Sequence, residues 1–472
     1  MKNHLTSFIS VFIFLSFTSL PAFSHQTFYV TNPNDNQGGS LRDALNMASK
    51  SNHGSRIYIS FKDDIKISKT LNYSGQYPVE IHGLGQTVFT GINTTLISSS
   101  NGADVSISRL NFRGPGGFSI ENRGDLNSDG GKGIFIDIRD DQTGMVSLNL
   151  NEVKVSDVAN HGIHVSDCNL ADKCGGGGGG AGEGSDASIT LNFSNVVVEN
   201  VGNGKFDADG VRVDERGIGS IYFNSVNSLY TKVGADGVEL DEGQSGSVVA
   251  IVNNSSFTDN GAYCNPDLLK PYMPKVDEAE FKDGEMKESD IPGKINGTQD
   301  DGCFEREVDL YDSGFVEEYE FGIDLDDGFD IDEAGPGSLR VDMVGSIINN
   351  NLDEGVDFDE EDAGGINVAF ISSIASGNND DGFKNSEEGD GSIKGLLLNV
   401  VSANNGGKGA VLEEEDSGSL NVDVKGTTTK ENDDMDNTGL EIVQDGDGSG
   451  LLTIINSDIS DGIDDEGVTI RN

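Results

Sequence analysis

The 472-residue chain has no tryptophan, and aromatic residues make up only 7% of it. This composition offers few ring faces on which a sugar could stack. Basic residues are also scarce: 31 lysines and arginines stand against 81 aspartates and glutamates, a formal net charge of −50 at pH 7. Such a negative surface repels nucleic acids and anionic membranes, which leaves cations and basic molecules as partners.

Long apolar runs are absent beyond the first 24 residues. Residues 1–24 have a basic start, an apolar stretch at 5–20, and the small residues Ala22 and Ser24 ahead of a cleavage point before His25. This pattern is typical of a secretory signal peptide. A membrane anchor is the alternative, but the apolar run is short for a span. We therefore expect an exported chain without a membrane span, secreted, periplasmic or on the cell surface.

Cysteine is rare too, and the four cysteines are Cys168, Cys174, Cys264 and Cys303. In an exported chain, four cysteines suggest two disulfides with three possible connectivities. We expect Cys168 to pair with Cys174 and Cys264 with Cys303, because each pair brackets an insertion described below. A zinc site is the alternative, although the spacing lacks a CxxC pair.

The negative charge is concentrated in the second part of the chain. Residues 1–200 hold 19 acidic and 14 basic residues, whereas residues 201–472 hold the other 62 acidic and 17 basic residues. Adaptation to high salt is one explanation, but it would acidify surfaces throughout. The asymmetry favours a local cause.

An internal repeat of 27 residues organises this acidic part. Six stretches align on a glycine: "ADGVRVDE" (208–215), "ADGVELDE" (235–242), "DDGFDIDE" (326–333), "DEGVDFDE" (353–360), "DDGFKNSE" (380–387) and "GKGAVLEE" (407–414). Four of the five glycine spacings are 27, and the fifth, 91, implies one or two turns plus an insertion. Weaker copies are centred on Gly133, Gly162, Gly439 and Gly467.

Each repeat unit has the pattern of short β-strands. A strand after the glycine leads to an acidic turn, then to a longer alternating stretch such as "INVAFISSI" (366–374), then to an Asn/Asp/Gly turn such as "ASGNNDD" (375–381). Such short, β-branched segments between turns indicate strands. One unit cannot bury its apolar side alone, but stacked units can.

The repeat resembles the right-handed parallel β-helix, the fold of pectate lyases and many surface proteins. "SIINNNLDEGVDF" (346–358) has the run of apolar, Asn, Gly and apolar residues typical of that fold. The resemblance implies an all-β solenoid of about a dozen coils over roughly residues 27–472. It does not imply a function, because this fold hosts lyases, hydrolases, adhesins and scaffolds.

The predicted organisation is a signal peptide at 1–24, a cap at 25–55 and a β-helix at 56–472. Insertions are expected near 168–187 and 264–303; each is either a functional loop or a disulfide-stapled decoration. In the cap, residues 38–48 predict a helix with Ser40 as N-cap. Its apolar face consists of Leu41, Ala44, Leu45 and Ala48. The C-terminal "GVTIRN" shows no cap, which predicts an open edge available for self-association.

Strand alternation predicts an acidic outer face on the repeat. Phe329 and Ile331 should point into the core, and Asp330 and Asp332 outward. Because coils stack about 4.8 Å apart, equivalent carboxylates form rows, and neighbours repel by about 3.5 kcal/mol at an effective dielectric near 20. Rows of carboxylate oxygens suit Ca²⁺. The metal-ligand candidates on this face are Asp214, Glu239, Asp241, Asp330, Asp332, Asp357 and Asp359, with Glu413 also placed outward.

Two turns predict further cation sites. "DLNSDG" (125–130) offers Asp125, Asn127 and Asp129, and "DGDGSG" (445–450) offers Asp445 and Asp447. Both resemble the first half of an EF-hand-type loop, but neither has the glutamate at the twelfth position. The pattern favours simple loop sites over a full EF-hand.

The resemblance to lyases implies one enzymatic alternative, in which Ca²⁺ on acidic residues bridges to a uronate and an Arg or Lys abstracts a proton. Arg212 is the candidate base, beside Asp214 and one coil from Glu239. The alternative is a structural role, in which Arg212 relieves the charge on a row of acidic side chains. The same two roles are open to Lys384. "NHGIHV" (160–165) faintly resembles a segment of galacturonan hydrolases, but their other signature segments are absent.

These observations predict an exported, non-catalytic β-helix that binds Ca²⁺ and contacts a surface, a glycan or a basic partner. The alternative is a Ca²⁺-dependent polysaccharide lyase or related carbohydrate-active enzyme. Nucleic acid is excluded as a partner by the charge.

Overall fold

The computed structural model describes residues 25–118, 130–168, 184–269, 278–291, 303–304, 307–311, 313–432 and 438–471. The expected signal peptide and the candidate ligands Asp125, Asn127 and Asp129 lie outside the described residues. Within the described part, no helix has the length and apolar character needed to cross a membrane.

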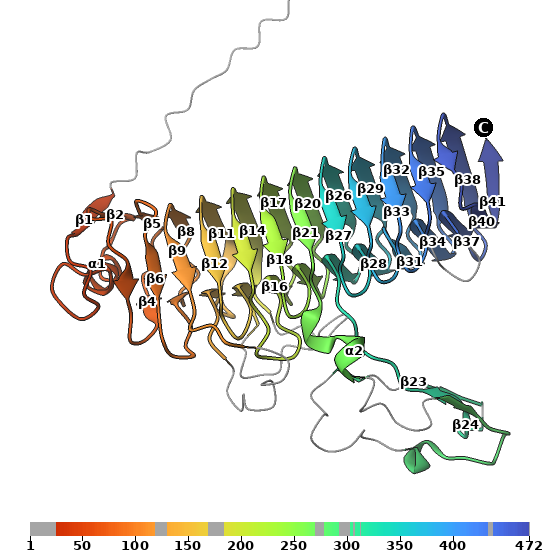
Figure 1. Cartoon of the computed structure of the whole chain (residues 1–472), viewed down its shortest axis with the longest axis horizontal. Helices are drawn as coiled ribbons and strands as arrows, with labels where there is room; N and C mark the ends of the chain where they lie inside the picture. The colour runs from red at the N-terminus through yellow and green to blue at the C-terminus, as the bar shows by residue number, and fades with distance from the viewer. Residues whose placement is uncertain are drawn as a thin grey trace, which may run out of the picture.

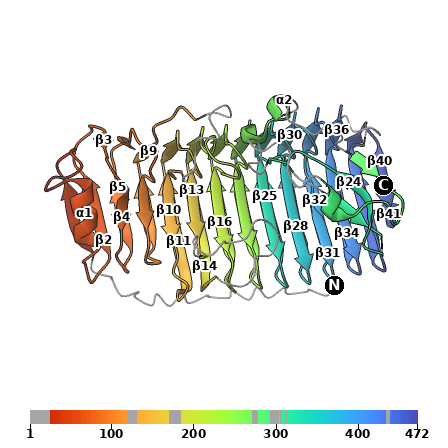
Figure 2. The ribbon, with the colours of Figure 1, turned by 90° about the horizontal axis from the view of Figure 1, so that it is seen from below.

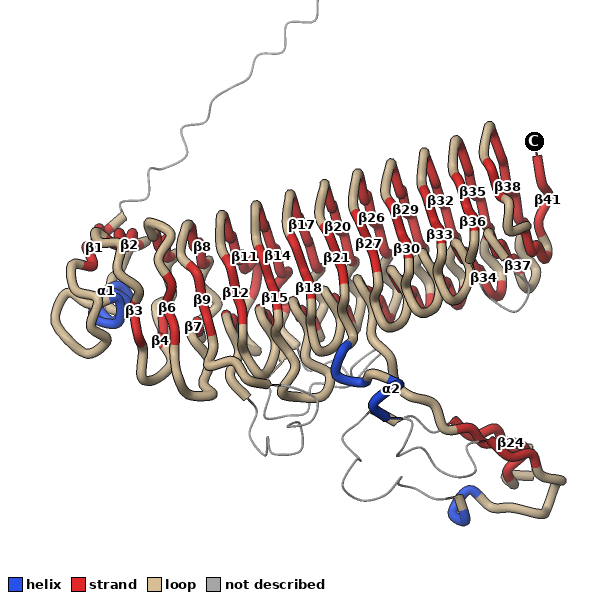
Figure 3. Tube along the Cα trace, in the orientation of Figure 1, coloured by secondary structure: helices blue, strands red, loops and turns tan. Residues whose placement is uncertain are grey.

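Three long parallel sheets, named A, B and C here, stack strand upon strand along the molecule (Figure 1). The chain visits the sheets in the order A, B, C in each coil, so neighbours in a sheet come from successive coils. The protein is a right-handed parallel β-helix, which confirms the predicted fold class. Figure 3 shows that strands and turns alternate around each coil.

Sheet A has fourteen strands: β1 (Gln26–Val30), β2 (Ser55–Ile59), β5 (Val79–His82), β8 (Val105–Ser108), β11 (Thr143–Asn151), β14 (Asp186–Ser194), β17 (Ile221–Val226), β20 (Val248–Asn253), β26 (Leu339–Val344), β29 (Ile366–Ile371), β32 (Ile393–Leu398), β35 (Ser419–Lys425), β38 (Ser449–Ile455) and β41 (Val468–Arg471). Sheet B has twelve: β3 (Ile65–Lys66), β6 (Thr87–Phe89), β9 (Asn111–Arg113), β12 (Lys154–Ser156), β15 (Val197–Glu199), β18 (Leu229–Thr231), β21 (Ser256–Thr258), β27 (Ile347–Asn349), β30 (Ile374–Ser376), β33 (Val401–Ala403), β36 (Thr428–Lys430) and β39 (Asp458–Ile459).

Sheet C also has twelve strands: β4 (Leu71–Tyr73), β7 (Ile97–Ser99), β10 (Ile134–Asp137), β13 (Ile163–Ser166), β16 (Val211–Glu215), β19 (Val238–Glu242), β25 (Phe329–Ala334), β28 (Val356–Asp362), β31 (Ser386–Gly389), β34 (Ala410–Asp416), β37 (Leu440–Gln444) and β40 (Ile463–Glu466). Figure 2, seen from below, shows β10, β13, β16, β25, β28, β31 and β34 following one another along the long axis.

Helix α1 (Leu41–Ala48) lies at the N-terminal end of the solenoid, as the sequence predicts (Figure 1). The Ser40 hydroxyl accepts a hydrogen bond from the Asp43 N–H, and the Asp43 carboxylate accepts one from the Gly39 N–H. The four predicted apolar residues of the helix are buried. At the other end, β39, β40 and β41 are the last strands of their sheets. Self-association through that edge stays a prediction.

The repeat glycines mark a close approach between coils. A Cβ atom on Gly328 would lie 2.4 Å from the Gly355 carbonyl oxygen, and one on Gly355 would lie 2.4 Å from that of Gly382. No side chain fits at these positions. The last weak copy was predicted wrongly, because the row continues from Gly439 to Gly462, whose carbonyl accepts the Gly439 N–H, and not to Gly467.

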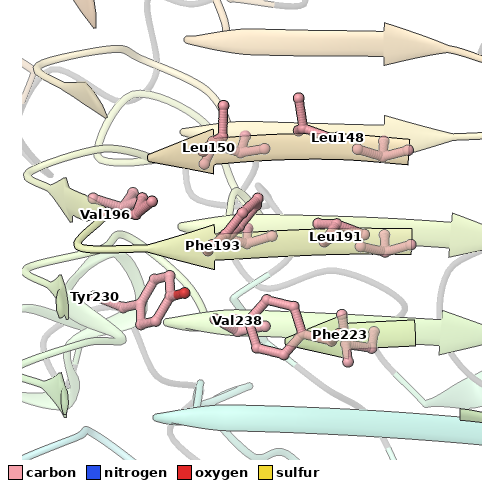
Figure 4. Close-up of a cluster of buried hydrophobic side chains, with 14 of the residues drawn as sticks. Leu148, Leu150, Leu191, Phe193, Val196, Phe223, Tyr230 and Val238 are labelled. Atoms are coloured by element: carbon pink, nitrogen blue, oxygen red, sulfur yellow. The ribbon is translucent and has the colours of Figure 1, made fainter. Parts of the chain in front are cut away.

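Apolar side chains fill the space between the three sheets (Figure 4). Phe329 and Ile331 are fully buried, as predicted. Phe329 packs between the rings of Phe257 and Phe358, with centroids 5.2 Å away on both sides. Stacked rings of this kind extend one core along successive coils and hold their register.

A row of asparagine amides lines the turn between sheets B and C. Asn260, Asn351, Asn378, Asn405 and Asn432 are buried, and each of the first four amides donates to the next at 2.9 to 3.1 Å. These bonds satisfy buried polar groups that would otherwise be costly to desolvate.

The large insertion interrupts this same turn between β21 and β25. Because β19 pairs directly with β25, the 91-residue interval holds a single 27-residue coil plus 64 further residues. The insertion between β21 and β25 is therefore longer than the predicted 264–303. The insertion extends away from the solenoid (Figures 1 and 3). Its elements are η3 (Ala262–Cys264), α2 (Pro266–Leu269), β22 (Glu278–Glu280), η5 (Glu288–Asp290), β23 (Glu307–Leu310) and β24 (Val316–Glu320), with β24 between β22 and β23 in a small antiparallel sheet.

The cysteines agree with the predicted oxidised state. Cys264 and Cys303 form a disulfide at the base of the insertion, as predicted. Cys168 is also disulfide-bonded. Its predicted partner Cys174, and most of the first insertion, lie outside the described residues.

Candidate metal site on sheet C

Two rows of charged side chains run across the outer face of sheet C. Arg212, Glu239, Asp330 and Asp357 are register partners in one row, and Asp214, Asp241, Asp332 and Asp359 in the other. The sequence prediction that these residues stand beside one another from coil to coil is confirmed. The alternation of β-strand side chains explains it, because Phe329 and Ile331 occupy the opposite face.

The rows are not an open surface, however, which the alternation pattern does not reveal. Asp241 is fully buried, and Asp214, Arg212 and Glu239 are each no more than 6% exposed. The charged face forms the floor of a cavity of about 490 Å³. Residues 323–327 at the end of the insertion, together with Phe206 and Asp207, line its walls. The insertion therefore turns an acidic face into an acidic pocket.

Carboxylates dominate this acidic pocket. Its acidic lining consists of Asp207, Asp236, Glu239, Asp324, Asp326, Asp327, Asp330, Asp332, Asp353, Glu354, Asp357 and Asp359. Arg212 and Lys384 are the basic residues among the described lining. Two cations cannot neutralise twelve acids, so the pocket retains a large negative charge unless protons or bound cations compensate it.

Arg212 is held by carboxylates on several sides. Its guanidinium lies 2.9 Å from the Asp214 carboxylate and forms ion pairs with Glu239 and Asp241. Burial alone would lower the pKa of Arg212, but Asp241, Glu239 and Asp214 outweigh burial and raise it well above the usual value. A guanidinium held in its charged form is a poor proton acceptor. The geometry favours charge relief over the role of general base for Arg212.

Lys384 has the corresponding role at the other end of the acidic pocket. Its ammonium lies 2.7 Å from Asp357 and 3.4 Å from Glu354. Burial tends to lower the pKa of Lys384, whereas Asp357 and Glu354 raise it strongly. Lys384 is therefore also a counter-ion rather than a base at neutral pH.

Several carboxylate oxygens in and beside the acidic pocket have no donor. Among the described residues, Asp241 Oδ1, Asp326 Oδ2, Asp357 Oδ1 and Asp359 Oδ1 are buried without a hydrogen-bond partner. Burial, then repulsion by Asp332, raises the pKa of Asp330 well above its ordinary value. Burial, then Asp357, raises the pKa of Asp359 to about 8. Donor-poor buried carboxylates are the groups that a cation stabilises most.

Three carboxylate groups have ligand atoms close enough to share an ion. Within each group the oxygens lie within 4.8 Å of one another. The groups are Glu239 with Asp241 and Asp332, Asp207 with Asp209 and Glu239, and Asp327 with Asp353 and Glu354. The hard oxygen donors fit Ca²⁺, which accepts flexible coordination by carboxylates. We favour Glu239, Asp241 and Asp332, because Asp241 Oδ1 has no hydrogen-bond partner. Asp209 Oδ2 of the second group also lacks a hydrogen-bond partner, but it lies 3.6 Å from the Arg212 guanidinium.

The predicted ligands separate into those that meet and those that do not. Glu239, Asp241 and Asp332 meet in one group, Asp330, Asp357 and Asp359 line the same cavity, and Asp214 binds Arg212 and His164. Asp445 and Asp447 are exposed and belong to none of the described groups.

Sequence reasoning missed the acids that precede each repeat glycine. These acids occupy equivalent positions just before successive strands of sheet C: Asp209, Asp236, Asp327 and Glu354. A side-chain oxygen of Asp327 accepts the Glu354 N–H at 2.8 Å. The signal was present as the recurring "DG" and "EG" pairs at 209–210, 236–237, 327–328 and 354–355.

A buried basic cluster adjoins the acidic pocket at its N-terminal end. His164 Nε2 lies 2.6 Å from Asp214, and its Nδ1 faces the Lys132 ammonium. Burial lowers the pKa of His164 to about 4 and that of His161 well below its usual value. Both imidazoles are neutral at neutral pH, so Asp214 links this cluster to Arg212 as an ionised carboxylate.

Comparison with known proteins leaves the family open. No protein-family model and no curated protein matches the chain. Among solved structures, the chain is similar to the pectate lyase Pel9A, with 12% sequence identity and a TM-score of 0.36. The match covers 93% of this chain and 80% of the other chain. The chain is also similar to the A-module of the mannuronan C-5 epimerase AlgE4 from Azotobacter vinelandii, with 12% identity, 93% and 94% coverage and a TM-score of 0.40.

A third similar structure is a GH136 lacto-N-biosidase from Eubacterium ramulus, with 8% sequence identity and a TM-score of 0.33. The match covers 95% of this chain and 68% of the other chain. At these identities and scores, the likenesses assign neither an activity nor a ligand to this chain. The function must be argued from the acidic pocket itself.

Proposed function

We propose that this protein is an exported Ca²⁺-binding β-helix whose acidic pocket holds divalent cations and contacts a glycan or a basic surface. The observation that carries the proposal is the buried carboxylate group of Glu239, Asp241 and Asp332, which includes an oxygen without a donor. Bound Ca²⁺ would supply positive charge to these oxygens and remove most of their mutual repulsion.

Export is supported by two independent features. The first 24 residues have the composition of a secretory signal, and the cysteines of the described residues are disulfide-bonded. Disulfides and millimolar-affinity Ca²⁺ sites both belong to extracytoplasmic compartments.

Calorimetric titration of the metal-free protein with Ca²⁺ tests the cation site. A binding isotherm with a defined stoichiometry is expected, and Asp332→Asn should lower the Ca²⁺ affinity by about tenfold or more, because a charged ligand is lost. Asp63→Asn is the matched control, since it removes the same charge from an exposed loop outside all candidate cation sites. An isotherm without binding, or equal losses in both variants, would overturn the proposal.

A Ca²⁺-dependent polysaccharide lyase or related carbohydrate-active enzyme is the second candidate. It is supported by Lys132 and His164, which stand beside Asp214 at the end of the acidic pocket. Incubation with pectate and alginate distinguishes the two candidates, because a lyase releases unsaturated products that absorb in the ultraviolet. Release that stops on chelation would favour the enzyme, whereas a cation-loaded protein without product would favour binding alone.

A further inference from the structure

A second row of acidic side chains lies inside the solenoid, at the turn from sheet C to sheet A. Its members are register partners on successive strands of sheet C: Glu215, Glu242, Glu333, Glu360, Glu387 and Glu414, followed by Gln444. Each glutamate is at most 1% exposed. We call this row the glutamate ladder.

In Glu387 and Glu414, one carboxyl oxygen has a hydrogen-bond donor and the other has none. Glu387 accepts the Gly391 N–H at 2.8 Å, and Glu414 accepts the Gly418 N–H at 2.5 Å, both through Oε1. The Oε2 atoms of both residues are buried and without a hydrogen-bond partner among the described residues. Glu387 and Glu414 are register partners on adjacent coils, so their carboxyl groups are neighbours along the row. Two ionised carboxylates have no hydrogen to share, but one proton between them makes the bond.

Full ionisation of the glutamate ladder would be costly. Charges about 4.8 Å apart repel by about 3.5 kcal/mol per neighbouring pair at an effective dielectric near 20. Several such pairs approach the whole stability of a folded protein. Among the described residues, the charged groups that act most strongly on Glu387 and Glu414 are acidic: Glu360 and Glu414 act on Glu387, and Glu387 and Asp416 act on Glu414. At the other end, the Arg216 guanidinium donates to Asp241 instead of the ladder.

Gln444 shows what the position requires. Its amide oxygen accepts the Leu420 N–H at 3.0 Å, and its amide nitrogen donates to the Asp445 carbonyl at 3.3 Å. An amide provides both an acceptor and donors without a charge, as the asparagine row does at the opposite turn. A protonated glutamate provides the same combination.

We propose that Glu387 and Glu414 are held in the folded protein as carboxylic acids whose O–H groups bond from coil to coil, and that loss of these protons loosens the C-terminal coils. These two members do not line the acidic pocket, so their titration is separable from cation binding there.

The direction of the pH dependence follows from burial and neighbours. Burial, then Glu360, raises the pKa of Glu387 to about 8, and burial raises that of Glu414 to about 7, from an unfolded value of 4.5. Between these values the folded state binds more protons than the unfolded state, so stability falls as pH rises. The contribution is complete below pH 4.5 and is lost as pH rises through about 7 to 8.

Thermal unfolding of the full chain in chelator, at about pH 5 and about pH 9, tests the proposal. The Glu387→Gln/Glu414→Gln variant should lose less Tm over this interval than the unmodified protein. The control is Glu388→Gln/Glu415→Gln, which removes the same charge from exposed neighbours. A variant whose loss equals that of the control overturns the proposal, because general charge repulsion then explains the pH dependence.

Infrared spectroscopy provides a second test that needs no unfolding. At neutral pH the unmodified protein should show the carbonyl-stretch band of protonated carboxylic acids. Glu414→Gln, which repeats the natural state at Gln444, should weaken that band, whereas Glu415→Gln should leave it unchanged. An unchanged band in Glu414→Gln overturns the proposal.

Discussion

Arg212 and Glu239 are register partners on adjacent coils, and their side chains form an ion pair that is more than nine-tenths hidden from solvent. The same guanidinium also contacts Asp214 and Asp241. One buried cation therefore joins two coils of sheet C at the point where the acidic pocket begins.

Replacement of Arg212 should destabilise the protein strongly. Arg212→Met leaves buried carboxylates uncompensated, so the free energy of unfolding in chelator should fall by about 3–5 kcal/mol. Urea denaturation measures it. Arg340→Met is the matched control, because Arg340 pairs with Asp342 while 57% exposed, and its loss should stay below about 1 kcal/mol. Similar losses in both variants would contradict the role assigned to Arg212.

Saturating Ca²⁺ should stabilise the folded protein. A ligand that binds only the folded state at about 100 times its Kd adds about 2.7 kcal/mol to the free energy of unfolding. Melting followed by circular dichroism, with Ca²⁺ and then with excess chelator, measures the change. The gain should shrink in Glu239→Gln and persist in Asp63→Asn, whose residue is exposed and outside the candidate cation sites. A Tm that does not respond to Ca²⁺ would argue against the site.

The repeat glycine should not tolerate even one methyl group. Gly355→Ala would place Cβ 2.4 Å from the Gly382 carbonyl oxygen, and the forced shift should cost about 1–3 kcal/mol or more. Gly91→Ala is the control, because nothing lies within 4 Å of its Cβ position. Chemical denaturation measures the free energy of unfolding of both variants. Equal values would mean that the coils can move apart at little cost.

Loss of the insertion disulfide should act locally. Cys264 and Cys303 close a loop with a sequence separation of 39, for which chain entropy gives a contribution of about 4 kcal/mol. Cys264→Ser with Cys303→Ser should therefore make the insertion more sensitive to limited proteolysis. The small core of Ile291, Val316, Tyr319 and Phe321 is separate from that of the β-helix, so the solenoid fragment should survive. Cleavage within the coils instead would show that the insertion supports the solenoid.

The strand pattern predicted which side chains share a face. Phe329 and Asp330 occupy opposite sides of sheet C, because successive residues of a strand point in opposite directions and the 27-residue spacing brings equivalent positions together. The capping helix could be predicted from the sequence as well, because its N-cap hydrogen bond joins Ser40 and Asp43, which are only three residues apart. The Cys264–Cys303 pair was foreseen because each cysteine flanks the interruption of the repeat.

Burial of the acidic rows could not be derived in this way. Asp326 reaches the acidic pocket from the end of an insertion whose path depends on its own core and disulfide, and no periodicity encodes that path. Glu333 is a different case, because alternation does place the fifth residue of its strand on the core side, where it joins the glutamate ladder.

The sequence by itself thus determined the coil, its repeat length, its apolar interior and the alignment of its acids, since these follow from local periodicity. Only the tertiary structure decided that Arg212 is enclosed, that Asp241 has an oxygen without a donor, and that Glu387 and Glu414 meet away from water. These outcomes depend on how much solvent and how many neighbours surround each charge. Both quantities are set by packing between coils and by the insertion, and neither is a property of one repeat.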